Sequence, residues 1–128
     1  MKNTISDNLV ESLIRSSPSK DAVSRCLAEM GLGIITALQQ SQISFEQARL
    51  DLFNLENYKA ARRHRLSPDT IRFFEWAMEF EDVTEIAPDA LAKSYQQAVH
   101  LAQRIIGRTR SKTETAGARR ARNHVAAR

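Results

Sequence analysis

Cysteine and long apolar runs are scarce in this sequence, and each scarcity excludes a class of protein. Cys26 is the only cysteine among 128 residues, so no disulfide can form within the chain and no paired-cysteine metal motif exists. No stretch approaches the roughly 20 apolar residues that span a bilayer. The first residues also lack the apolar run of a signal peptide. We therefore expect a cytoplasmic protein without a membrane anchor.

Residues that interrupt helices are also few, since the chain has three prolines and four glycines. A chain of this length is usually built around one hydrophobic core. No segment alternates polar and apolar residues well enough to predict a strand. The expected fold class is therefore all-α, a compact single-domain bundle of about five or six helices.

The positive charge of the chain is confined to its last part. Residues 1–107 carry twelve Lys and Arg against fourteen Asp and Glu, a net charge of −2, whereas residues 108–128 carry seven against one, a net charge of +6. The hydrophobic period also stops after Gly107. We predict a helical domain over residues 1–107 and a flexible basic C-terminal tail over residues 108–128, disordered when alone.

Apolar residues recur at helical spacing in separate segments, each opened by a capping residue or closed by a breaker. Ser67-Pro68-Asp69 is the strongest start signal, and Asn54 is expected to end the preceding short helix in a left-handed conformation. Helices are expected over residues 4–15, 19–38, 44–53, 56–64, 67–80 and 88–107. The fifth is apolar around most of its circumference, which predicts a central position.

Two glycines lie inside the second expected helix, at Gly31 and Gly33. Each costs about 1 kcal/mol relative to alanine in a helix. We expect a close approach of another helix to compensate at these positions. A hinge or a ligand contact is the alternative.

Six acidic residues fall within fifteen positions that contain no Lys or Arg, and they are the candidate partner-binding site. A solvated acidic face would explain them, as would a docking surface for a basic partner. A metal site is the weakest reading, because no spaced histidines accompany the carboxylates. Any exposed members of Phe73, Phe74 and Trp76 would serve as apolar anchors. The six acidic residues are Glu75, Glu79, Glu81, Asp82, Glu85 and Asp89.

A basic run over residues 59–65 is the second candidate surface. Together with the tail it could contact phosphates, although a charged surface that pairs with the acidic residues is the simpler explanation. The candidate nucleic-acid-binding residues are Lys59, Arg62, Arg63, Arg65, Arg119, Arg120 and Arg122.

Catalytic motifs are missing from the sequence. It has no phosphate-cradling glycine loop and no nucleophile elbow, and its histidines show no ligand spacing. Cys26 is expected to be a small buried residue. We expect no enzyme activity, no cofactor and no bound metal.

Several short segments resemble a family of small bacterial proteins known only as a domain of unknown function, over about Leu9 to Ile106. The segments are Gly31-Leu32-Gly33 with Ala37-Leu38, Ile43-Ser44-Phe45-Glu46-Gln47-Ala48, Leu52-Phe53-Asn54 and Glu79-Phe80-Glu81-Asp82. The resemblance implies no catalytic residues.

In size and style the chain also resembles immunity proteins of contact-dependent growth-inhibition and polymorphic toxin systems. That resemblance implies a binding protein that neutralises a nuclease-type toxin by covering its active site, with the acidic residues acting as a competing polyanion. A nucleic-acid-associated regulator and a structural subunit that self-associates through the aromatic helix are the alternatives.

Overall fold

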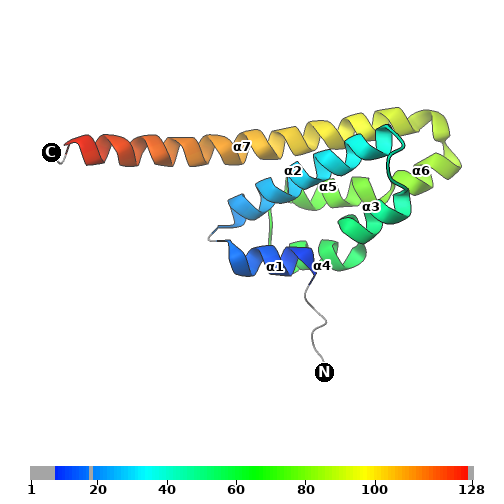
Figure 1. Ribbon diagram of the computed structural model, residues 1–128, viewed down its shortest axis with the longest axis horizontal. Helices are drawn as coiled ribbons and strands as arrows, with labels where there is room; N and C mark the ends of the chain where they lie inside the picture. The colour runs from blue at the N-terminus through cyan, green and yellow to red at the C-terminus, as the bar shows by residue number, and fades with distance from the viewer. Residues whose placement is uncertain (1–7, 18, 127–128) are drawn as a thin grey trace, which may run out of the picture.

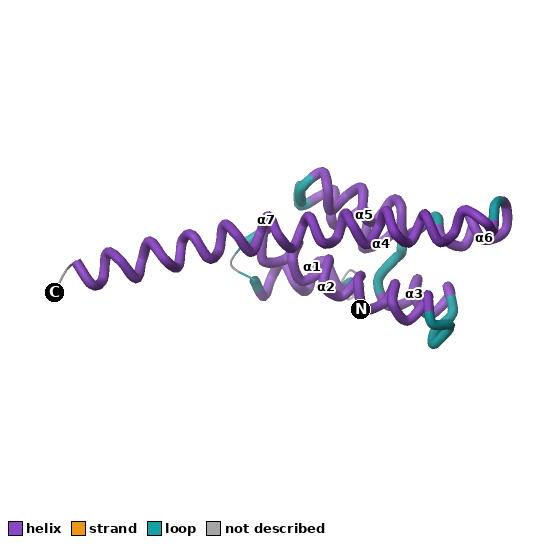
Figure 2. The backbone as a smooth tube through the Cα atoms, turned by 90° about the horizontal axis from the view of Figure 1, so that it is seen from above, coloured by secondary structure: helices purple, strands orange, loops and turns teal. Residues whose placement is uncertain are grey.

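Helices alone make up the regular structure of the described part of the chain (Figures 1 and 2). The computed structural model describes residues 8–17 and 19–126, with side chains up to Thr109. This confirms the all-α prediction. The elements are α1 (Leu9–Ser16), α2 (Lys20–Gln39), α3 (Phe45–Asp51), α4 (Leu55–Arg63), α5 (Pro68–Met78), α6 (Phe80–Ile86), the 3-10 turn η2 (Pro88–Ala90) and α7 (Leu91–Ala126).

Side-chain oxygens cap the starts of five helices by accepting a backbone N–H three residues further on. The predicted caps at Ser19, Ser44 and Ser67 are confirmed. Asn54 is extended, with φ −135°, and begins α4, so the prediction that it ends a helix in the left-handed conformation is wrong. Asn8 is likewise extended and caps α1, which begins at Leu9; the first residues of the helix predicted over 4–15 lie outside the described residues.

The hydrophobic core lies where α2, α5 and α7 pack together. α2 packs along α7, and α5 contacts α2, α4, α6 and α7, in agreement with its predicted central position. Aromatic rings also pack edge to face in the core: the ring centroids of Phe53, which follows α3, and Phe73 on α5 are 5.8 Å apart, and those of Phe80 on α6 and Tyr95 on α7 are 4.8 Å apart. Phe73, Phe74 and Phe80 are completely or almost completely buried.

The two glycines of α2 have different surroundings. A Cβ at Gly31 would overlap Cε2 and Cζ of Phe73, so the predicted close approach is confirmed there. At Gly33 nothing lies within 4 Å of such a Cβ and the residue is exposed, so the same prediction is wrong. The core therefore accounts for one glycine and leaves the other unexplained.

The last helix does not end where the sequence indicates. α7 continues through Gly107 to Ala126, and the prediction that Gly107 terminates it is wrong. A carboxylate on α5 favours this continuation, because Asp69 Oδ2 lies 3.3 Å from Arg104 Nε and 3.2 Å from Arg108 Nη1. Beyond this point α7 projects past the body of the bundle (Figure 1). The expected flexibility of the segment in solution stays a prediction.

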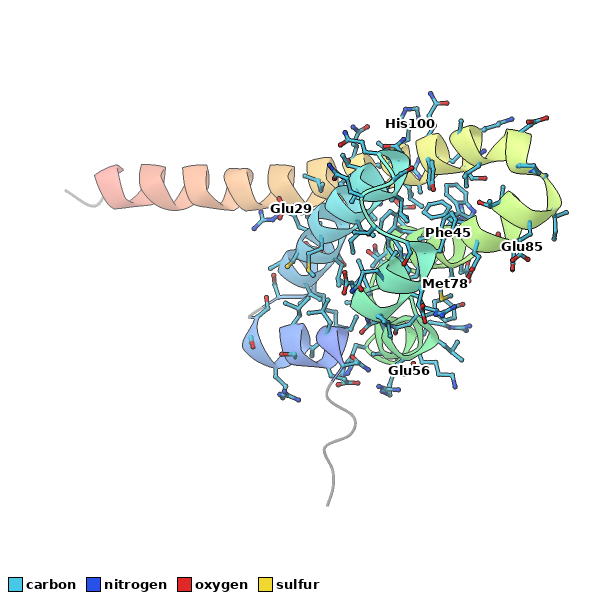
Figure 3. The ribbon with its side chains drawn as sticks, turned by 45° about the vertical axis from the view of Figure 1, so that its right-hand side comes forward. Glu29, Phe45, Glu56, Met78, Glu85 and His100 are labelled. Atoms are coloured by element: carbon cyan, nitrogen blue, oxygen red, sulfur yellow. The ribbon has the colours of Figure 1, made fainter. Side chains whose placement is uncertain are left out.

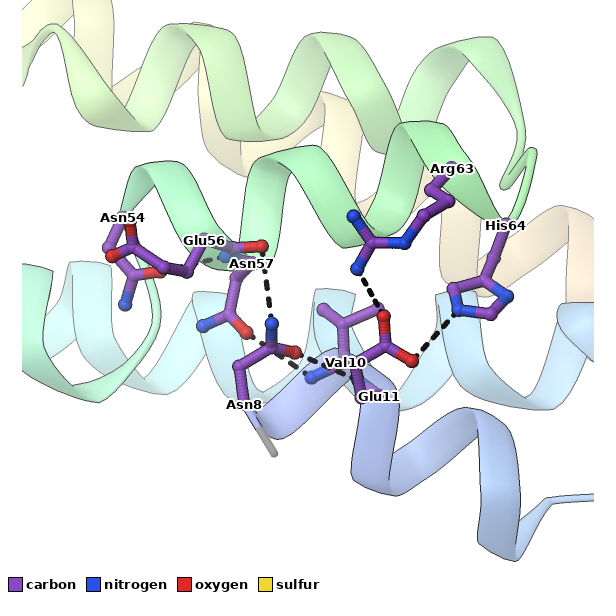
Figure 4. A network of polar contacts seen from close by, with 8 residues as sticks. All are labelled: Asn8, Val10, Glu11, Asn54, Glu56, Asn57, Arg63 and His64. Atoms are coloured by element: carbon purple, nitrogen blue, oxygen red, sulfur yellow. Dashed lines mark hydrogen bonds and ion pairs between the residues drawn. The ribbon is translucent and has the colours of Figure 1, made fainter. Parts of the chain in front are cut away.

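Polar contacts join α1 to α4 (Figure 4). Buried Asn57 accepts the N–H of Val10 at 3.2 Å through Oδ1 and donates to the carbonyl of Leu52 at 3.0 Å through Nδ2. At the other end of α4, Arg63 forms an ion pair with Glu11, and Nε2 of His64 lies 2.9 Å from the same carboxylate. Hydrogen bonding from Arg63, and then from His64, lowers the pKa of Glu11 below its ordinary value of 4.5.

This lowered pKa predicts a pH-dependent contribution to stability. Because the folded protein holds the Glu11 proton less tightly than the unfolded chain does, the contribution is present above pH 4.5 and is lost as pH falls through the folded-state pKa. Glu11→Gln should cost about 1 kcal/mol at neutral pH. Urea unfolding at pH 7 and below pH 4 measures the cost. The cost of Glu11→Gln should be smaller below pH 4 than at pH 7. The control substitution Glu56→Gln, at an exposed position, should change the free energy of unfolding little at either pH. An equal cost for Glu11→Gln at both pH values would contradict the assignment.

Candidate functional site

The six acidic residues gather at one end of the molecule. They lie on the last turns of α5, at the α5–α6 junction, on α6 and in η2, and all six are exposed. This end of the bundle is opposite the free end of α7 (Figure 1). Figure 3 shows Glu85 here, well separated from Glu56 on α4. We call this surface the acidic end, comprising Glu75, Glu79, Glu81, Asp82, Glu85 and Asp89.

Two carboxylates of the acidic end have partners. Glu75 accepts a hydrogen bond from the Tyr58 hydroxyl at 2.7 Å, and Glu81 lies 3.6 Å from Arg49 Nη1 with both side chains about half exposed. An ion pair this exposed contributes little to stability. The other four carboxylates form no hydrogen bond or ion pair within the described part of the chain. These four are Glu79, Asp82, Glu85 and Asp89.

One apolar residue of this end was not anticipated from the sequence. Ile86, the last residue of α6, is 82% exposed, one helical turn after Asp82 and next to Glu85. An aliphatic side chain between carboxylates is the only sequence signal that could have identified it. An exposed apolar side chain at this position can supply buried contact area when a partner covers it.

The apolar anchors proposed on α5 are mostly buried. Phe73 and Phe74 have no exposed surface, so of the three candidate anchors these two are excluded. They face the core because α5 is covered by helices on several sides. Trp76 is half-buried and lines a shallow pocket with His100 and Arg104 of α7.

The basic run over residues 59–65 is exposed but partly engaged. Arg63 pairs with Glu11, and Arg62 lies over the Tyr58 ring at 5.8 Å from its centroid. Tyr58 in turn binds Glu75, so this run is connected to the acidic end through one tyrosine. Lys59 and Arg65 are exposed. The side chains of Arg119, Arg120 and Arg122 lie outside those described, although their backbone belongs to α7.

Asp69 was recognised from the sequence only as an acid at a helix start. In the structure its side chain is 15% exposed and receives the guanidinium groups of both Arg104 and Arg108. These partners are more than thirty residues away in the chain, so no local pattern could have identified them. Asp69 joins the start of α5 to the part of α7 from which the basic segment projects.

Ligand-type residues do not converge within the described residues. No group of three or more His, Cys, Asp or Glu side chains is placed to hold a metal ion. Cys26 is only half-buried, with Sγ 4.0 Å from Met30 Sδ, which corrects the expectation of a buried residue. Among the described helices none has the length and apolar content needed to cross a membrane.

The fold and this surface define a small all-α domain with an acidic end and a basic helical extension. The chain belongs to the family described as "Protein of unknown function (DUF3969)", which matches residues 18–118. Compared with the predicted resemblance over about Leu9 to Ile106, the match begins later, after α1, and ends later, within the basic segment that the prediction left outside. The comparisons with curated proteins and with solved structures gave no match.

Proposed function

We propose that this protein is a non-catalytic binding protein whose acidic end docks on a basic surface of another protein. The observation that carries the proposal is Ile86, 82% exposed beside carboxylates that have no partner within the described residues. In such a surface the apolar group supplies buried contact, and the charges supply association rate and specificity.

The partner with the most suitable chemistry is a nuclease-type toxin domain. A nuclease must present basic groups to bind phosphate. A compact surface of carboxylates can occupy those groups in place of the nucleic acid, which is the action of an immunity protein. The net charge of −2 over residues 1–107 supports this role, since the positive excess lies on the projecting part of α7, away from the acidic end.

Charge reversal tests the proposal directly. The triple variant Glu79→Lys, Asp82→Lys, Glu85→Lys should lose at least about tenfold in association rate with a toxin domain encoded beside this protein, because each reversal replaces attraction by repulsion. The matched control reverses three exposed carboxylates elsewhere, Glu29, Glu46 and Glu56, and gives the same net charge. Surface plasmon resonance at low salt measures both. If both triple variants lost association rate equally, the effect would come from net charge alone, and the acidic end would not be the docking site.

A nucleic-acid-associated regulator is the second candidate, favoured by the register of α7. Arg108, Lys112, Arg119 and Arg122 follow one another at spacings of four, seven and three residues, which places these positions on one side of the helix. The variants above also separate the two candidates. Under this alternative the wild-type protein binds a DNA duplex with a steep salt dependence, and reversal at the acidic end strengthens that binding.

A further inference from the structure

An apolar groove runs along the face of α2 that the bundle leaves uncovered. α2 contributes Met30, Gly33, Ile34 and Ala37, and Leu9 and Ile43 supply the walls together with Asp51. We call it the α2 groove. A second groove shares Leu9 and Asp51 with it and is bordered by Leu50 and Leu55.

Exposed apolar side chains are concentrated around these two grooves. Within the described residues four large hydrophobic side chains are exposed, and three of them lie here: Met30 at 37%, Leu50 at 69% and Leu55 at 50%. Leaving such a surface in water forgoes the free energy of burying it, about 25 cal/mol for each Å². Exposed apolar side chains grouped in this way and bordered by polar residues indicate an interface.

Large and small side chains alternate along the α2 groove, so that two copies of α2 can pack with large residues facing small ones. Along the groove a large residue, Met30, is followed by the small Gly33, then the large Ile34 and the small Ala37. If a second copy of α2 crosses antiparallel about a two-fold axis between positions 33 and 34, Met30 faces the partner's Ala37 and Ile34 faces the partner's Gly33. The open space at Gly33 then receives a side chain, which explains a glycine that the core does not require.

Charge favours the same arrangement. No charged residue lies between Met30 and Ala37, so the paired segments of α2 bring no like charges of their own together. α2 and α7 run side by side in opposite directions, with the acidic end at one extreme of the molecule and the basic part of α7 at the other (Figure 1). An antiparallel pair therefore places each acidic end on the side of the partner's basic extension, which is the attractive orientation.

We propose that the chain forms a two-fold homodimer through the α2 groove, with antiparallel α2 helices at its centre. A standard stable interface takes about 800 Å² from each partner, which is about a tenth of the 8157 Å² surface of this chain. The two adjoining grooves draw their surface from α1, α2, α3 and α4, so the contact extends well beyond one helix. The proposal is independent of the acidic end as a docking site.

Sedimentation equilibrium of the full chain tests the proposed homodimer. Protein concentrations from about 1 to 500 μM cover ordinary dimer affinities. The wild-type mass should approach twice 14.5 kDa. Gly33→Glu should raise the dissociation constant at least about 100-fold, because two carboxylates meet at the axis. Gly107→Glu is the matched control, since Gly107 is also an exposed helical glycine with nothing within 4 Å. A wild-type monomer at every concentration, or equal dimerisation of the two variants, overturns the proposal.

Cross-linking checks the register without relying on affinity. In a Cys26→Ser background, Gly33→Cys places one thiol of each copy beside the axis, and a short bis-maleimide should join them rapidly at dilute protein. Gly107→Cys in the same background should not be joined. Circular dichroism should show the wild-type helix content for both, because neither position contacts the core. Cross-linking at Gly107 alone would place the contact elsewhere and overturn the proposed interface.

Discussion

Gly31→Ala is expected to lower the free energy of unfolding by about 1–3 kcal/mol, the usual cost of adding a methyl group to a full core. The added Cβ overlaps two ring atoms of Phe73. That ring cannot move freely, because it has no exposed surface and packs edge to face against Phe53 and Phe74. Chemical denaturation at neutral pH measures the change.

Gly33→Ala is the control for this prediction, two residues along the same helix. Nothing in the same chain meets a Cβ at Gly33, so at protein concentrations where the chain is monomeric only the intrinsic helix propensity changes. The protein should gain about 0.5–1 kcal/mol. The change in the free energy of unfolding should therefore have opposite signs for Gly31→Ala and Gly33→Ala. A neutral or stabilising Gly31→Ala would show that Phe73 repacks without cost.

Asn57→Ala is expected to have an effect of similar or greater size, about 2–4 kcal/mol, because two buried backbone groups lose their partner. Val10 lies in the first turn of α1, where its N–H has no carbonyl partner within the helix, and Asn57 Oδ1 supplies the acceptor. The carbonyl of Leu52 loses its hydrogen bond from Nδ2 at the same time. Thermal unfolding followed by circular dichroism measures the loss.

Lys59→Ala is the matched substitution, two residues further along α4 and exposed. It removes no buried hydrogen bond, so stability should change by less than about 0.5 kcal/mol. Hydrogen exchange gives a second measurement, since loss of the Asn57 contacts should increase exchange in α1 more than in α7. A cost for Asn57→Ala no larger than that of Lys59→Ala would contradict the role of Asn57 in joining α1 to α4.

Features that depend on residues within one helical turn were predictable from the sequence. Ser19, Ser44 and Ser67 cap helices as expected, because a cap needs only a side-chain oxygen and an N–H three residues away. The crowding of acidic residues over residues 75–89 also implied exposed carboxylates, since charged groups are rarely buried without partners. All six are exposed.

Features that depend on distant partners were not predictable. The end of α7 was misplaced because glycine often terminates a helix, yet Asp69 on α5 binds Arg104 and Arg108 on either side of Gly107. Asn54 was read as a helix end because local sequence does not distinguish the residue that closes one helix from the residue that opens the next. The sequence also left open which of Phe73, Phe74 and Trp76 is exposed, because a helix that is apolar around most of its circumference does not show which residues its neighbours cover.

The amino-acid sequence alone determined the helical class, the helix starts at Ser19, Ser44 and Ser67, and the separation of negative and positive charge along the chain, since each follows from composition or from contacts within a few residues. The tertiary structure decided which glycine meets a phenylalanine ring, which carboxylates have partners and which apolar face of α2 remains uncovered. Those outcomes depend on the packing of α2, α5 and α7, which brings together side chains tens of residues apart.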